Sequence, residues 1–285
     1  MNQARLDIKH NFLKQLLFRL DYDGILEQDV EACVLKLRDK LHSIGFVNFG
    51  NRVENQVDLQ VKMDLNIPNQ NEFSISNTNK SLIYVFATEG NKEILEISKT
   101  FCTFTVEIES AYQTFGKYMD LLADVIYEIK EITPYFRANR IGLRKINICF
   151  LEDLRLLSTY FTNAAFNFDD LVCRFSEFAC TASNSVTILS KDIFQINYVR
   201  NIQQGIMQQE NGNQSQIYQV VLDIDIYNEN SREILAMLSD KENIKEMLTR
   251  QNTIEFETFY LSLTNEFLKK LKQDKFNDTI IKGVV

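Results

Sequence analysis

Glycine and proline are scarce in this chain. There are nine and two of them among 285 residues, together about 4%, where about 12% is usual. The glycine-dependent G-x-G-x-x-G, P-loop and G-x-S-x-G patterns are all absent. Rossmann dehydrogenase, kinase and hydrolase-triad chemistry are therefore excluded. The shortage also predicts long helices and strands joined by turns rich in asparagine and aspartate.

Basic residues and histidine are also in short supply. Lysine and arginine number 31 against 39 acidic residues, which gives a net charge of −8. This balance disfavours nucleic acid and anionic membranes as partners, although a local basic patch stays compatible with nucleic-acid binding. The two histidines, His10 and His42, have no serine or cysteine nucleophile pattern beside them. We predict no cofactor and no metal site.

The five cysteines include no C-x-x-C pair, and Cys33, Cys102 and Cys149 lie in apolar runs. A thiol in such a run behaves as a small buried hydrophobe, so we expect reduced cysteines. The longest apolar stretch beside a strand, 82–87, is far shorter than the roughly 20 residues of a membrane span. Residues 1–14 lack the apolar core of a secretory signal. We expect a cytoplasmic protein without a membrane segment.

Hydrophobic periodicity predicts an α+β fold of antiparallel strands and long helices. Helices are expected over 27–44, 112–132 and 254–272, with Gly45 at the left-handed position after the first. Strands are expected over 12–20, 57–63, 82–88, 93–98, 101–109, 139–150, 172–181, 186–189, 193–200 and 217–227, and polar loops over 68–80 and 203–216. No linker rich in proline, glycine or serine divides the chain. We therefore predict two closely packed sheet-plus-helix halves, 1–152 and 153–285.

The segment RIGLRKIN, residues 140–147, carries the main candidate site. On a strand, Arg140, Gly142 and Arg144 lie on one face, and glycine leaves space between the two guanidinium groups. The pair could bracket a carboxylate or a phosphate held close to the backbone. In the alternative interpretation, the arginines pair with acids of a neighbouring strand, such as Glu107 or Glu109, and only stabilise the sheet.

The same octapeptide resembles the Arg-Ile/Val-Gly-Leu-Arg-Tyr-Ile-Asn strand of a sporadically distributed family of bacterial proteins. The strands and helix before it, and the closing strands and helix, resemble that family's layout over most of the chain. Lys145 departs from the pattern, because the family usually has tyrosine there. The family has no established biochemical activity. The resemblance implies the fold and, from the sporadic distribution, an accessory role in a bacterial defence or mobile-element gene cluster.

Two groups of acidic residues are weaker candidates for metal binding. Asp223 and Asp225 share a strand face and could hold a divalent cation, although such alternation is typical of a solvated strand. Glu54 and Asp58, followed by Lys62, resemble the acid-then-lysine order of a metal-dependent nuclease core. The spacing does not fit that core, because Asp58 is too near Lys62.

The predicted helix near the C-terminus has more aromatic residues than one buried helix face requires. We interpret these residues as an interface with a protein partner or a second copy of the chain. They are Phe256, Phe259, Tyr260 and Phe267.

These observations favour a non-enzymatic, cytoplasmic binding or regulatory component. It would recognise a protein partner or an anionic ligand through Arg140 and Arg144, or self-associate. The alternative function is a divalent-metal-dependent nuclease or phosphohydrolase, with either Asp223 and Asp225 or Glu54 and Asp58 on the metal and the arginines on phosphate. The alternative requires the carboxylates and arginines to converge on one cleft.

Overall fold

The computed structural model describes residues 8, 10, 12–63, 71–108, 114–167, 180–208 and 214–273, with side chains 55–63 and 71–80 left aside. The strands are β1 (Leu13–Asp23), β2 (Asn48–Met63), β3 (Asn71–Ala87), β4 (Glu93–Ile97), β5 (Phe101–Glu107), β6 (Arg137–Leu151), β7 (Ala182–Lys191), β8 (Phe194–Gln208) and β9 (Gln214–Asn228). The helices are α2 (Glu27–Ser43), α3 (Gly116–Lys130), α4 (Leu157–Tyr160), α5 (Ser231–Met237), α6 (Lys241–Ser262) and α7 (Asn265–Leu271). The α+β class predicted from the sequence is confirmed.

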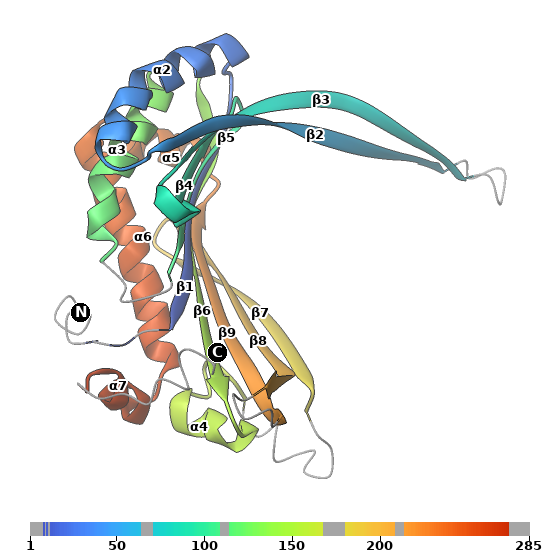
Figure 1. The fold of residues 1–285 in the computed structure, drawn as a ribbon, viewed down its shortest axis with the longest axis vertical. Helices are drawn as coiled ribbons and strands as arrows, with labels where there is room; N and C mark the ends of the chain where they lie inside the picture. The colour runs from blue at the N-terminus through green and yellow to red at the C-terminus, as the bar shows by residue number, and fades with distance from the viewer. Residues whose placement is uncertain are drawn as a thin grey trace.

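All nine strands form one antiparallel sheet in the order β2-β3-β4-β5-β1-β6-β9-β8-β7 (Figure 1). Its centre is the β1–β6 pair, where Phe18 lies opposite Leu143. The ladder between β6 and β9 runs from Ile141 opposite Asn228 to Leu151 opposite Tyr218. This ladder crosses the predicted division at residue 152, and that division itself stays a prediction.

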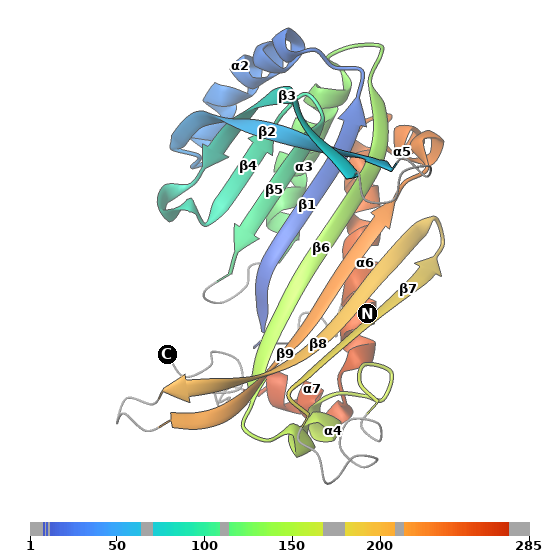
Figure 2. The same ribbon diagram turned by 90° about the vertical axis from the view of Figure 1, so that its right-hand side faces the viewer.

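The long helices lie on one face of the sheet and leave the other without helical cover (Figures 1 and 2). α3 buries an apolar stripe that includes Leu122 and Ile126, both fully buried. Each such side chain contributes about 1.5–3 kcal/mol through its burial. The core therefore lies between sheet and helices, and any site open to solvent on the sheet belongs to the other face, which we call the uncovered face.

The end of α2 forms as the sequence predicts. Gly45 has φ +106°, in the left-handed region, and its N–H donates to the carbonyl of His42 at 3.1 Å. The N–H of Phe46 donates to the carbonyl of Leu41 at 3.0 Å, and Phe46 then packs in the core. These two bonds satisfy carbonyls that the last turn leaves open.

Three expectations about regular structure were wrong. The predicted loop 203–216 is strand at both of its ends, because β8 continues to Gln208 and β9 begins at Gln214. The predicted loop 68–80 is extended from residue 71, where β3 pairs with β2 as an antiparallel hairpin. The predicted helix 254–272 is two helices, because Leu263 adopts an extended conformation and bridges Phe161, and Thr264 then caps α7. Most of the predicted strand 172–181 lies outside the described residues. None of the described helices is long and apolar enough to cross a membrane.

Candidate functional site

The predicted arginine strand is β6, at the centre of the sheet. Along it, buried Ile141 and Leu143 alternate with Arg140, Gly142 and Arg144. The buried residues face the helices, and because side chains alternate along a strand, the arginines lie on the uncovered face. The neighbouring strands β1 and β9 decide what the two arginines contact.

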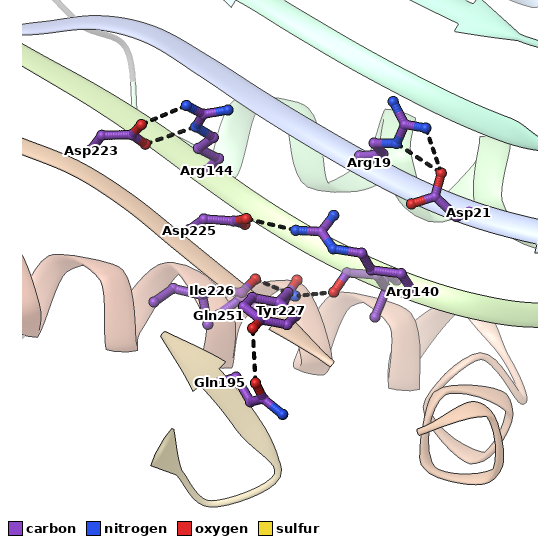
Figure 3. Close-up of polar contacts among 11 residues, drawn as sticks. Arg19, Asp21, Arg140, Arg144, Gln195, Asp223, Asp225, Ile226, Tyr227 and Gln251 are labelled. Carbon is purple, nitrogen blue, oxygen red and sulfur yellow. Dashed lines mark hydrogen bonds and ion pairs between the residues drawn. The ribbon is translucent and has the colours of Figure 1, made fainter. Parts of the chain in front are cut away.

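Both arginines form ion pairs with aspartates of β9 (Figure 3). Arg144 donates Nε to Asp223 Oδ1 at 2.7 Å and Nη2 to Oδ2 at 2.5 Å. Arg140 donates Nη2 to Asp225 Oδ2 at 2.6 Å. The structure thus brings together two sets of residues that the sequence presents separately. The arginines pair with a neighbouring strand, as the alternative interpretation expected, but with β9.

Gly142 makes room for Arg140. A Cβ atom at this position would lie 3.0 Å from Arg140 Nη1 and 3.2 Å from Asp225 Oδ1. The guanidinium group therefore lies over the glycine, and its Cζ is 4.9 Å from the centre of the Tyr227 ring, within cation–π range. The space beside Gly142 that we interpreted as a ligand site is filled by Arg140 itself.

The aspartates of these pairs are more buried than the arginines. The side chain of Asp223 is 12% exposed and that of Arg144 is 42% exposed. The hydrogen bonds that Arg144 donates to Asp223 raise the pKa of the Arg144 guanidinium group despite the opposing effect of burial. Burial raises the pKa of the Asp225 carboxyl, and the lowering by Arg140 and Arg144 does not outweigh it. Arg140 and Arg144 therefore offset part of the effect of burial on the Asp225 carboxylate.

The ion-pair pattern continues beyond β6 and β9. On β1, Arg19 donates Nε to Asp21 at 2.8 Å, and Asp21 lies directly opposite Arg140. Further along the face, Arg52 of β2 pairs with Glu96 of β4 at 3.0 Å. Sequence reasoning missed these residues. The sequence shows their alternation along each strand. It does not show the strand order that brings these side chains to one face of the sheet.

Beside these pairs, the uncovered face contains a cavity of about 430 Å³. Carboxylates and arginines of β1, β2 and β4 line it, and Arg19 also lies over the ring of Phe101, with Cζ 5.0 Å from the ring centre. The lining residues are Arg19, Asp21, Arg52, Glu54, Glu96, Thr100, Phe101 and Thr103. We call the four arginine–carboxylate pairs and this cavity the ion-pair face.

The metal-binding candidates do not gather into a cation site. Both oxygens of Asp223 already accept hydrogen bonds from Arg144. Across the residues that the structure describes, no group of three or more His, Cys, Asp or Glu side chains is placed to hold a metal ion. Glu54 lines the cavity, and the side chains of Asp58 and Lys62 lie outside the description. His10 pairs with the carbonyl of Gln273 at 2.9 Å.

The aromatic group near the C-terminus lies mostly in the core. Phe267 is fully buried and stacks on Phe12 with ring centres 5.6 Å apart, and Phe259 lies 5.3 Å from the same ring. Phe256 is buried and only Tyr260 is partly exposed. Contacts within the chain therefore account for the richness in aromatics that we interpreted as an interface.

A separate ion pair, buried in the core, connects β6 to α6. Lys145 donates Nζ to Glu255 Oε2 at 2.6 Å and to Asn252 Oδ1 at 2.8 Å. Gln251, one residue earlier, donates to the carbonyls of Ile141 and Ile226. Lys145 is the residue at which the octapeptide departs from the family pattern. Its charge has a buried structural partner, so this cluster is not an accessible site.

Comparison of the chain with protein-family models gives no match, and comparison with curated proteins gives none either. The resemblance of residues 140–147 to the bacterial family stays a prediction.

Proposed function

We propose that this protein is a non-enzymatic, cytoplasmic binding component that recognises a protein partner through the ion-pair face. The observation that carries the proposal is the pairing of Arg19, Arg52, Arg140 and Arg144, each with a carboxylate on the same face. An accessory role in a bacterial defence or mobile-element gene cluster is part of this proposal, and it rests on the resemblance of β6 alone.

Charge balance on this face favours a protein over a polyanion. Each arginine already has a carboxylate within 3.0 Å, so a phosphate would compete with an existing ion pair. The whole chain carries −8, which further disfavours nucleic acid. A protein surface needs no net positive charge, and it can accept hydrogen bonds from the outer N–H groups of the guanidinium forks.

The face is also preorganised. Arg144 is held by two hydrogen bonds, and Arg140 is held between Asp225 and the Tyr227 ring. Tyr227 in turn donates its hydroxyl to Gln195 of β8 at 2.8 Å. Side chains that are already ordered lose less conformational entropy when a partner binds. Arginine and tyrosine are also enriched at protein interfaces, which supports the same proposal.

The metal-dependent nuclease or phosphohydrolase is less well supported. The arginines and aspartates do converge, as that alternative requires, but they converge on one another. The cavity on this face borders Arg19 and Arg52, and its lining does not include Asp223 or Asp225. A cation at Asp223 would have to displace Arg144 from both carboxylate oxygens.

A charge-swap variant tests the proposal. The double substitution Arg144→Asp with Asp223→Arg keeps an ion pair between β6 and β9. It exchanges the positions of the positive and the negative charge on the ion-pair face. The matched control swaps Asp153 and Arg155, an exposed pair outside the strands. Affinity purification from the native host, quantified by mass spectrometry, should recover a specific protein with the wild type and the control but not with the face swap. Purified components should then reproduce the loss.

Three results would overturn the proposal. The first is recovery of the same partner by the face swap at the wild-type level. The second is a rise in melting temperature with Mg²⁺ or Mn²⁺ that Asp223→Asn abolishes, which would favour the metal-dependent enzyme instead. The third is a rise with inorganic phosphate that Arg144→Gln abolishes, which would favour an anionic ligand over a protein.

A further inference from the structure

Strand β7 is an edge of the sheet and lacks the protection that edge strands usually have. Among the described residues it pairs only with β8, so one side of its backbone has no strand neighbour. Its sequence ASNSVTILSK has no charged residue before Lys191. Edge strands normally avoid pairing with other chains through charges, prolines or bulges, and 182–190 has neither charge nor proline.

Apolar side chains are exposed on both faces of this edge. Val186 and Ile188, 57% and 65% exposed, lie on the uncovered face opposite Val199 and Asn197 of β8. Leu189, 44% exposed, lies on the helix side. A strand added beside β7 would cover apolar groups above and below the sheet.

The helix side of the edge is hollowed. A groove of about 560 Å³ lies between β7, β8 and α6, and its apolar lining includes Leu189, Ile196 and Leu261. Leu261 is 67% exposed and lies on α6. Lys191 at the end of β7 pairs with Glu257 of α6, so this charge is already engaged. An incoming strand would therefore meet the apolar side chains of Ile254 and Leu261 on α6 as well as the backbone of β7.

The opposite edge strand of the sheet, β2, differs from β7 in carrying charged residues. β2 carries Arg52 and Glu54 on its described part, and Arg52 pairs with Glu96. Among its described side chains it also exposes two apolar ones, Phe49 at 48% and Val53 at 54%, so the difference between the edges lies in charge. Charged residues of this kind discourage edge-to-edge pairing. The two edges thus differ in the feature that controls strand addition.

We propose that β7 pairs antiparallel with β7 of a second copy of this chain, about a two-fold axis at Thr187. In that register Val186 of each copy lies opposite Ile188 of the other, and both pairs fall on the uncovered face. Thr187 lies opposite its own counterpart on the helix side. Lys191 lies opposite Ser183, so no like charges face each other. The two sheets join into one.

A second copy fits this edge because the strand is complementary to itself. A two-fold interface uses the same patch on both subunits, and nine uncharged residues with central Val186 and Ile188 satisfy that condition without repulsion. The charge of −8 on each copy predicts a weaker dimer at low ionic strength, because the repulsion between copies is then less screened.

Light scattering on the purified protein tests the proposal, with the variants Ile188→Lys and Val53→Lys as a matched pair. Both place lysine at an exposed apolar position of an edge strand. We expect the wild type and Val53→Lys to be dimers across a hundredfold range of concentration. Ile188→Lys should raise the dimer dissociation constant tenfold or more, since it places a charge opposite Val186 of the other copy. Circular dichroism checks that both variants fold.

A covalent probe covers the case in which Ile188→Lys fails to fold. Thr187→Cys under mild oxidation should give a disulfide-linked dimer, whereas Val53→Cys and the wild type under the same oxidant should not. A wild type that is monomeric throughout the concentration range overturns the proposal. So does a dimer that Ile188→Lys leaves intact. These measurements need no partner protein, so they can fail or succeed independently of the proposed binding function of the ion-pair face.

Discussion

Lys145 and Glu255 form an ion pair inside the core, with 2.6 Å between Nζ and Oε2 and side chains only 6% and 3% exposed. Removing two charges from water costs several kcal/mol each, and their mutual attraction offsets this only with good geometry. The pair therefore adds little net stability compared with apolar residues. Either partner alone, in contrast, would be a buried charge without its counter-ion. This asymmetry gives the pair a specific mutational signature.

We expect Lys145→Met and Glu255→Leu each to lower the free energy of unfolding by about 3–5 kcal/mol. The double variant Lys145→Met with Glu255→Leu should lie within about 1–2 kcal/mol of the wild type, because it removes both charges together. Urea denaturation of the four proteins gives the coupling energy directly. Additive losses in the double variant would contradict the buried-pair interpretation.

Gly142 and Arg140 should also be coupled. Gly142→Ala would place Cβ 3.0 Å from Arg140 Nη1, so the guanidinium must move and its bond to Asp225 weakens. With Arg140→Ala already present, the same Gly142→Ala should stabilise the protein by about 0.5–1 kcal/mol, because alanine restricts the unfolded chain. Urea denaturation in both backgrounds checks the expected change of sign. Equal effects of Gly142→Ala in the two backgrounds would contradict the interpretation that Gly142 makes room for the Arg140 guanidinium group.

Local features were the ones that the sequence could predict. α2 was predictable because its periodic apolar positions and Gly45 lie within one segment and need no distant partner. β6 was predictable from its alternation. The break after α6 was not, because Leu263 leaves the helix to bridge Phe161, about a hundred residues earlier in the chain.

The partners in the candidate site were hidden for the same reason. Asp225 and Arg140 are 85 positions apart, and Asp223 and Arg144 are 79 apart. The sequence shows apolar and charged residues alternating along β6 and along β9. Which strands become neighbours, and in which register, depends on the whole sheet. Glu107, one of the two partners expected for the arginines, instead accepts a hydrogen bond from Gln15 of β1 at 2.6 Å. The other, Glu109, lies outside the described residues. Strand order, more than residue type, decided which of the charges met.

The buried cysteines should resist alkylation in the native protein. Burial raises the pKa of Cys33 to about 12 and raises the pKa values of Cys102 and Cys149 further, so few thiolates exist at pH 8. Iodoacetamide followed by peptide mapping should label Cys180, which is partly exposed, well before these three. Urea should remove the difference. Rapid labelling of Cys102 without denaturant would contradict this description of the core.

Asp124 of α3 should make stability depend on acid pH. It accepts hydrogen bonds from Lys40 of α2 and from Lys241 at the start of α6. Burial alone would raise its pKa, but the bonds from Lys241 and Lys40 outweigh burial and hold the pKa below the ordinary value of 3.8. A lowered carboxyl pKa stabilises the folded state above the ordinary value. That contribution is lost as the pH falls through the lowered pKa.

We therefore expect Asp124→Asn to lower the free energy of unfolding by about 1 kcal/mol at pH 7, since two partly exposed ion pairs are lost. The difference from the wild type should begin to shrink as the pH falls below about 4, where the carboxyl of the unfolded chain takes up a proton, and it should vanish below the lowered pKa of the folded protein. Asp120→Asn is the control on the same helix: Asp120 is 84% exposed and contacts only Lys245 among the described ion pairs. It should cost a few tenths of a kcal/mol at most. Urea denaturation of the three proteins from pH 7 to 3 measures these differences, and a loss for Asp124→Asn that stays constant over that range would contradict the assignment.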